Sequence, residues 1–174
     1  MPDQYSARNA NAARDGEDGK PISPLSADSC ILRHVARASR AVVAAYDPAL
    51  AEFDLTGHQF NLMKTVGNMG PMTVGALADT LGMDASGVPR AIRPLCDQDL
   101  IAVERGADRR QRLLSLTAAG RRLLDRATPA WARVQAELVD AIGADRWIAL
   151  MTDLRTVRRA ATSCSTRKPA EAAD

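Results

Sequence analysis

The sequence predicts a mainly α-helical protein with one small β-hairpin, and three observations support this class. Hydrophobic residues make up 46% of the chain but aromatic residues only 3%, so aliphatic side chains and alanine must build the core, a composition that favours helices. Apolar residues recur at helical spacing through most of the chain. Two short runs, both within residues 100–116, are typical of strands.

Chain length and composition predict a single folded unit with a polar tail at each end. A chain of 174 residues is about the size of one domain. Residues 1–27 and 163–174 are polar and show almost no apolar periodicity, so we expect both to be flexible. The folded unit should therefore span residues 28–162.

Residues 28–46 should form the first helix. Asp28 and Ser29 are residue types that commonly start helices. The apolar residues that follow recur at helical spacing: Ile31, Val35, Ala38, Val42 and Ala45. We expect the pair Asp47-Pro48 to bend or interrupt this helix, because proline has no amide hydrogen for the helical ladder.

A capping box marks the start of the second helix. At the spacing of Thr56 and Gln59, the threonine hydroxyl can accept from the Gln59 amide while the Gln59 side chain returns to the Thr56 amide. The helix should run over residues 57–66, and the glycines and proline of residues 67–71 should end it.

Two short helices should follow, joined by a tight turn. Thr73 is placed to cap the third helix, and Gly82 should stop it. Either Asp84 or Ser86 can cap a fourth helix, whose apolar face carries Val88, Ile92 and Leu95. Such a pair of helices is a helix-turn-helix.

Residues 100–104 and 112–116 should form the two strands of a hairpin. The segment between them contains Gly106 and three arginines, and it forms the turn. A helix-turn-helix followed by a hairpin with a basic tip is a winged helix-turn-helix, in which the hairpin is the wing.

Two long helices should complete the fold. Thr117 can cap a helix that runs to about Ile142, and Gly143 separates it from a final helix over residues 145–161. These helices carry more apolar side chains than a thin DNA-binding unit can cover: Leu123, Leu124, Trp131, Val134, Leu138, Trp147, Leu150, Met151 and Leu154. We therefore expect residues 28–55 and 117–162 to form a helical dimerisation region attached to the winged helix-turn-helix of residues 56–116, an α+β arrangement.

Positive charge is concentrated in the predicted winged helix-turn-helix. The whole chain has a net charge of +2, whereas residues 86–122 carry eight basic and four acidic side chains. Arginines on the exposed side of the fourth helix could donate to guanine edges in the major groove, and those of the wing could reach phosphates, with Asp108 holding Arg110 in a fixed direction. The expected DNA-binding residues are Thr73, Ser86, Pro89, Arg90, Arg93, Asp108, Arg109, Arg110 and Arg112.

Several stretches over residues 28–142 resemble the MarR family of winged helix-turn-helix regulators. The most specific are Leu55–Phe60, Gly70–Ala78, and Gly106–Arg110 followed by Leu116–Gly120; Ala38–Val42 with Tyr46-Asp47, and Ala127–Trp131 with Gln135, resemble one branch of that family. The resemblance implies a homodimer whose recognition helices enter successive major grooves of a pseudo-palindromic operator. It also implies a small-molecule pocket between the dimerisation helices and the winged domain.

The chain departs from the family pattern at three places. Asp99 stands where the family usually has glycine before the strand, a position that could require positive φ. Gly87 and Pro89 stand where the recognition helix usually carries small hydroxyl residues. Pro94 removes the helical bond to the Arg90 carbonyl and should bend the helix.

The expected effector is a small organic molecule that releases a repressor from its operator. The two helices that would wall the family's pocket supply four candidate ligand-binding residues: His34, Arg37, His58 and Met63. An arginine with histidines suits a carboxylate or a phenolate. By resemblance alone, an aromatic acid or its thioester is expected.

A thiol-based alternative depends on Cys30. With Asp28 as cap, Cys30 falls in the first helical turn, where the helix dipole favours a thiolate, and His34 lies four residues further on. It resembles the hydroperoxide-sensing branch of the family, although in that branch the sensing cysteine would align with Leu32. The other interpretation is a small residue packed in the dimer interface. We expect Cys96 to be structural and Cys164 to have no specific role.

Other functional classes have little support. The sequence lacks the common nucleotide-binding, hydrolase and metalloprotease motifs, and its cysteines do not have metal-binding spacing, so we expect no enzyme activity, metal or cofactor. No apolar run could span a membrane and the start does not resemble a signal peptide, so we expect a cytoplasmic protein. A winged helix that binds protein is the remaining alternative, and it would lack salt-dependent binding to duplex DNA.

Overall fold

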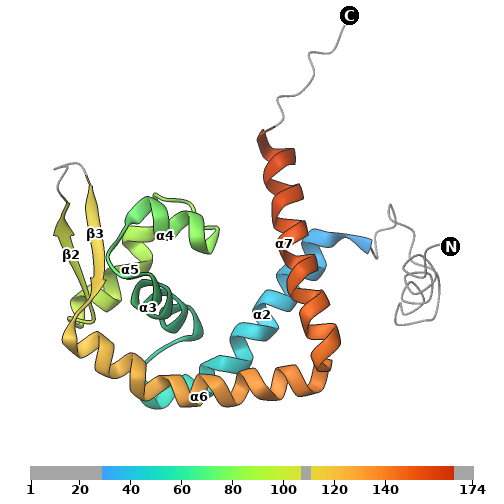
Figure 1. The fold of residues 1–174 in the computed structure, drawn as a ribbon, viewed down its shortest axis with the longest axis horizontal. Coiled ribbons are helices and arrows are strands. Elements are labelled where there is room, and N and C mark those ends of the chain that lie inside the picture. Colours follow the sequence, from blue (N-terminus) through green and yellow to red (C-terminus); the bar gives the residue numbers. More distant parts are fainter. Residues whose placement is uncertain (1–28, 107–110, 167–174) are drawn as a thin grey trace, which may run out of the picture.

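The computed structural model describes residues 29–106 and 111–166, and over these ranges it is mostly helical with a three-stranded antiparallel sheet. The predicted fold class is confirmed. Helices α3, α4 and α5 pack with the sheet into a winged-helix unit, drawn on the left of Figure 1. Helix α6 runs from this unit along the bottom of the view to α2 and α7.

Helix α2 spans Ile31–Leu50 and contains Pro48, so the predicted interruption at Asp47-Pro48 is wrong. Pro48 and Ala44 are both exposed, and water can reach the Ala44 carbonyl that lost its helical donor. Cys30 is the N-cap residue and makes no side-chain capping bond, while the predicted cap Asp28 lies outside the described residues. A short 3₁₀ turn, η3 (Ala51–Phe53), follows the helix.

Helix α3 (Gly57–Met69) begins with the predicted capping box. The Gln59 amide donates to Thr56 Oγ1 at 3.2 Å, and the Thr56 amide donates to Gln59 Oε1 at 2.8 Å. The helix runs beyond the predicted end at Val66, because Gly67 lies within it and faces the side chains of Leu116 and Leu124. Gly70, with φ of 73°, ends the helix instead.

Helix α4 (Val74–Leu81) is capped by Thr73, whose Oγ1 accepts from the Ala76 amide at 3.1 Å, and ends at Gly82 with φ of 66°. Both features confirm the prediction. Its partner α5 spans Val88–Asp97, with Val88, Ile92 and Leu95 buried as predicted.

The predicted cap of α5 is wrong, because neither Asp84 nor Ser86 caps it. Gly87 is the N-cap and already has helical dihedral angles, so the preceding turn leads directly into the helix. The Asp84 carboxylate instead accepts from the Ser86 amide at 2.7 Å, a hydrogen bond that lowers the pKa of Asp84.

The sheet has the order β1-β3-β2. Strands β2 (Ile101–Arg105) and β3 (Arg112–Leu116) form the predicted hairpin, in which Val103 pairs with Leu114. Strand β1 (Met72–Thr73) pairs with the other edge of β3 and was not predicted. Two residues are too few to show an alternating pattern. This edge pairing fixes the start of α4 against the wing.

Helix α6 spans Ala118–Ile142 with Thr117 as its cap, as predicted, and α7 spans Ala144–Thr166. The latter extends past the predicted end near Ala161, and the hydroxyls of Thr162 and Ser163 donate to the carbonyls four residues earlier, both at 3.0 Å. The core lies within the winged-helix unit and against α6, and its largest fully buried side chains are Phe60, Leu50, Met63, Leu77, Leu95, Leu114, Val66 and Val88.

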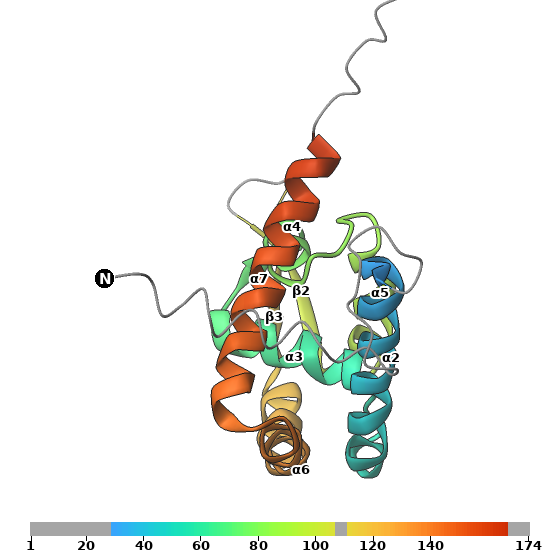
Figure 2. The ribbon, with the colours of Figure 1, turned by 90° about the vertical axis from the view of Figure 1, so that its right-hand side faces the viewer.

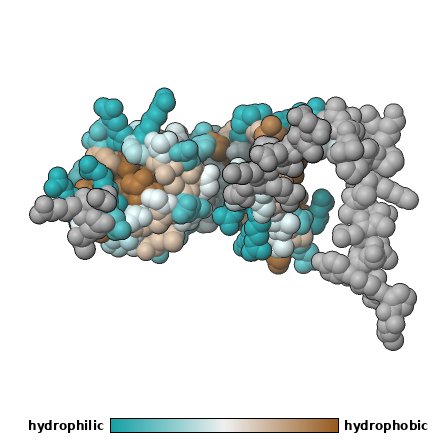
Figure 3. Space-filling view, turned by 90° about the horizontal axis from the view of Figure 1, so that it is seen from above, coloured by the Kyte–Doolittle hydropathy of each residue, from teal (hydrophilic) through white to brown (hydrophobic). Residues whose placement is uncertain are grey.

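The N-terminal part of α2 and the whole of α7 form an arm that is poorly covered. The two helices stand apart in Figure 2, and every described side chain of α7 is exposed or half-buried. Seen from above, apolar surface lies on both the winged-helix unit and the arm (Figure 3). Exposed large apolar side chains of the arm are Ile31, Leu32, Val35, Val42, Ile148 and Leu154.

Candidate nucleic-acid interface and ligand cleft

Helix α5 has one buried and one exposed face. Val88, Ile92 and Leu95 anchor it in the core. On the opposite side Pro89, Arg90 and Arg93 are exposed. An α-helix anchored in this way can enter a DNA major groove with its arginines foremost.

Within this exposed face, Arg93 and Asp97 are an (i, i+4) pair. Arg93 Nε lies 3.7 Å from Asp97 Oδ2, and the two side chains are 81% and 68% exposed. A pair so exposed and so widely separated contributes little to stability. The Arg93 guanidinium therefore keeps donors available for a ligand.

The prolines of α5 occupy different positions in it. Pro89 lies in the first turn, where the amides have no helical partner. Pro94 lies inside the helix, which nevertheless continues to Asp97. Pro94 is exposed, so the Arg90 carbonyl that it deprives of a donor lies on the exposed side.

The other predicted contact residues of this region are less similar to one another. Ser86 is exposed in the turn before α5, beside the predicted groove-facing side. Thr73 is half-buried and its hydroxyl is already the cap of α4. Its position suits the fold as well as a DNA contact.

The wing places two arginines directly opposite each other. Arg105 at the end of β2 pairs in register with Arg112 at the start of β3, and both are exposed. Like charges at paired positions destabilise a hairpin, and no carboxylate of the described chain forms an ion pair with either arginine. Such a pair can be stabilised by an anion such as a phosphate.

Arg105 was not among the predicted contacts, although its mirror position to Arg112 in the hairpin could have identified it. The predicted wing residues Asp108, Arg109 and Arg110 lie outside the described residues.

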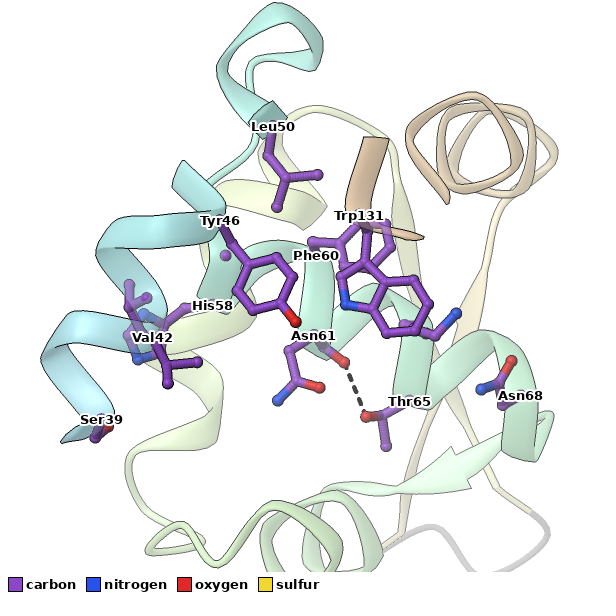
Figure 4. Close-up of a pocket in the computed structure, with 13 residues that line it drawn as sticks. Ser39, Val42, Tyr46, Leu50, His58, Phe60, Asn61, Thr65, Asn68 and Trp131 are labelled. Carbon is purple, nitrogen blue, oxygen red and sulfur yellow. Dashed lines mark hydrogen bonds between the residues drawn. The ribbon is translucent and has the colours of Figure 1, made fainter. Parts of the chain in front are cut away.

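A cleft of about 500 Å³ opens between α2, α3 and α6 (Figure 4). Of the predicted ligand-binding residues, only His58 lines it. Met63 is fully buried in the core, because it lies on the face of α3 that packs under α5. His34 and Arg37 are exposed on the N-terminal half of α2 and do not line the cleft.

Aromatic side chains that sequence reasoning missed form much of the cleft wall. Trp131 from α6 stacks near Phe60 of α3, with ring centroids 6.0 Å apart. Tyr46 from α2 points into the same space in Figure 4, and its hydroxyl donates to Gln135 Oε1 at 2.5 Å. Partial burial raises the pKa of Tyr46.

The cleft therefore joins the two segment pairs in which the sequence resembles one branch of a family. Tyr46 and Asp47 belong to one pair, Trp131 and Gln135 to the other. The Asp47 carboxylate accepts from the Gly57 amide at 2.7 Å, which ties α2 to the start of α3. That shared pattern was the signal that could have identified Tyr46 and Trp131 as cleft residues.

The three cysteines lie far apart in the fold. Cys30 is exposed and precedes α2, so it is not in the first helical turn as predicted. Cys96 is half-buried beside the core, and burial followed by the neighbouring Asp97 raises the pKa of its thiol. Cys164 is exposed near the end of α7.

Within residues 29–106 and 111–166, no cluster of three or more His, Cys, Asp or Glu side chains could hold a metal ion. Over the same part of the chain, no helix has the length and apolar character required to cross a membrane.

Comparison with known proteins finds both sequence and structural similarity. Residues 53–111 match a model of the MarR family. The transcriptional regulator MosR of M. tuberculosis, in complex with DNA, is 32% identical, with a TM-score of 0.71 over 78% of this chain and 98% of that one. A second MosR structure is 30% identical, with a TM-score of 0.69 over 80% of this chain and 100% of that one.

The transcriptional repressor CouR, bound to a 23-mer DNA duplex, is 25% identical, with a TM-score of 0.67 over 80% of this chain and 99% of that one. A comparison with curated proteins finds no match.

Proposed function

Because the chain belongs to the MarR family of transcriptional regulators, we propose that it binds operator DNA as a homodimer and is released by a small organic effector. The recognition element is α5, and the wing contacts flanking phosphates. The expected role is that of a repressor without enzymatic activity.

One observation carries the DNA-binding part of the proposal. The buried face of α5 leaves Arg90 and Arg93 exposed on its other side, and the adjoining hairpin carries the opposed Arg105 and Arg112. Helix arginines suit guanine edges in a major groove, whereas wing arginines suit phosphates. MosR and CouR, which share this fold, have been solved with DNA bound.

The homodimer is supported by the exposed apolar arm. Ile31, Leu32 and Ile148 are 58%, 76% and 68% exposed in the single chain. Contiguous apolar surface of this kind marks a protein interface, and a second copy of the same arm would bury it. Pairing through α2, α6 and α7 would present two α5 helices to successive major grooves.

The effector site is the cleft between α2, α3 and α6. It lies where the arm joins the winged-helix unit, with α2 and α6 on one side and α3 on the other. A ligand held there can bias the position of the winged-helix unit relative to the dimerisation helices, and so the spacing of the two α5 helices.

A gel-shift titration with duplex DNA from upstream of the protein's own gene tests DNA binding. We expect saturable, sequence-selective binding that weakens steeply as salt rises, because basic side chains release counterions from phosphates. Absence of duplex binding at low salt, on this and on other promoters, would support the protein-binding alternative.

The same titration after mild peroxide treatment separates the two modes of release. Release by a small molecule predicts unchanged binding after oxidation. Loss of binding that Cys30→Ser prevents would instead establish thiol sensing at this exposed cysteine.

A further inference from the structure

Lys64 is the charged residue of the cleft, and its ammonium rests against aromatic rings. Its Nζ lies 4.2 Å from the ring centroid of Trp131 and 5.7 Å from that of Phe60. No carboxylate of the described residues lies within ion-pairing distance of it. Its positive charge is therefore compensated by ring faces alone, and these are weaker partners than an anion.

The rest of the cleft lining contains no acidic side chain. Its polar residues include Asn61 and Asn68, whose amide groups can donate hydrogen bonds, while the aromatic rings of Tyr46 and Trp131 provide flat apolar walls. A cleft with one cation, no carboxylate and aromatic walls is suited to a flat molecule that carries a negative charge.

We propose that Lys64 is the anion-binding residue of the effector cleft and that the effector is an aromatic carboxylate. Its ring lies against Trp131 and Tyr46, and its carboxylate accepts from the Lys64 ammonium. This inference rests on the proposed function, because it assumes that the cleft is the effector site. The volume of about 500 Å³ is sufficient for a molecule of one or two rings.

The position of Lys64 on α3 connects this contact to the DNA-binding helix. On the other side of α3, Leu62, Met63 and Val66 are buried in the core that also holds Ile92 and Leu95 of α5. An effector that draws the ammonium away from Trp131 changes the contacts of α3 with α6. Because the core is close-packed, a shift of α3 is passed to α5.

Fluorescence titration of the full chain tests the ligand class. In a Trp147→Phe background Trp131 is the remaining tryptophan, and it reports on the ring that Lys64 contacts. The probes are benzoate, phenylacetate and 2-naphthoate, each paired with its neutral amide. We expect at least one acid to bind saturably and about tenfold more tightly than its amide, as a charge-assisted hydrogen bond implies.

Substitutions of Lys64 assign the anion contact. Lys64→Met, which keeps the length of the side chain, should weaken binding of the preferred acid about tenfold and leave that of its amide unchanged. Lys64→Arg should restore most of the difference. The control Arg133→Met removes one positive charge from an exposed position of α6 outside the cleft and should change neither affinity.

Three results would overturn the inference: equal affinity for acid and amide, unchanged acid binding in Lys64→Met, or no saturable response to any of the three acids. DNA binding is measured separately on the same wild-type preparation. A failure of the proposed function then appears as absent DNA binding, whereas a failure of the Lys64 assignment appears in titrations without DNA.

Discussion

Gly120 at the start of α6 is pressed against the backbone of Leu100 at the start of the wing. A Cβ atom at position 120 would lie 2.0 Å from the Leu100 carbonyl oxygen. Thr117 completes the junction, because its hydroxyl donates to the Asp99 carbonyl at 2.6 Å and accepts from the Gly120 amide at 2.9 Å. The segment Leu116–Gly120 thus joins the wing to the dimerisation helix through contacts that only threonine or serine and glycine can make.

Gly120→Ala should lower the free energy of unfolding by roughly 1–3 kcal/mol, the usual cost of inserting an atom into a close-packed site. The control is Gly75→Ala in α4, where a Cβ would approach only Thr73 Oγ1, at 3.9 Å. Alanine is the better helix former, so the control should be neutral or stabilising by up to about 1 kcal/mol. Urea denaturation measures both, and equal midpoints would contradict the close approach.

Arg93→Ala should weaken DNA binding and relax the preference at one base pair, by about 1–3 kcal/mol of discrimination. Arg93 is mostly exposed on α5 opposite its buried face. Affinities for the operator and for single-base variants measure the effect, and wild-type Asp97 remains as an internal constant. An equal loss on operator and on random DNA would contradict base reading by Arg93.

Arg105→Gln should have opposite effects on stability and on DNA affinity. It removes a like-charge pair with Arg112, so the free protein should gain a few tenths of a kcal/mol. Binding should weaken about equally on all sequences, and the slope of log affinity against log salt should fall by about one. Chemical denaturation and salt titrations provide the two measurements; unchanged salt dependence would exclude a phosphate contact.

Leu32→Glu and Ile148→Glu should each shift the protein toward the monomer, because a carboxylate would replace an apolar side chain of the arm. Sedimentation velocity over a range of concentrations measures the change. Met69→Glu is the matched control, since Met69 is 57% exposed but lies at the end of α3. If the control dissociates the dimer equally, the interface lies elsewhere.

Tyr46→Phe should cost about 1 kcal/mol of stability at neutral pH, since it removes the hydroxyl that donates to Gln135. Burial raises the pKa of Tyr46, so folding favours its protonated form. The wild type should therefore lose stability as the pH rises above about 10, through the raised pKa. In Tyr46→Phe this part of the alkaline loss should disappear, and denaturation at pH 8 and pH 11 compares the two.

Local patterns predicted the secondary structure well where neighbouring residues carry the signal. The Thr56–Gln59 capping box, the Thr73 and Thr117 caps and the buried stripe of α5 depend on residues within two helical turns of each other. Asp99 shows the same logic: the resemblance indicated a glycine-like position, and its φ is 55°.

Predictions were wrong where distant packing outweighs a local preference. Pro48 lies within α2 because the exposed backbone at Ala44 tolerates the lost bond, while Leu50 in the next turn is fully buried. Met63 was assigned to the cleft, but the direction of α3 relative to α5 places it in the core. No periodicity within one helix could reveal which neighbour its faces meet.

The sequence by itself determined the order of the helices, the wing and the family resemblance, because caps, apolar periodicity and glycine positions are local properties. Tertiary structure alone decided which residues line the cleft, the pairing of Arg105 with Arg112, and the approach of Lys64 to Trp131. These depend on the angles at which α2, α3 and α6 pack and on strand register. Both are set by contacts between residues far apart in the chain.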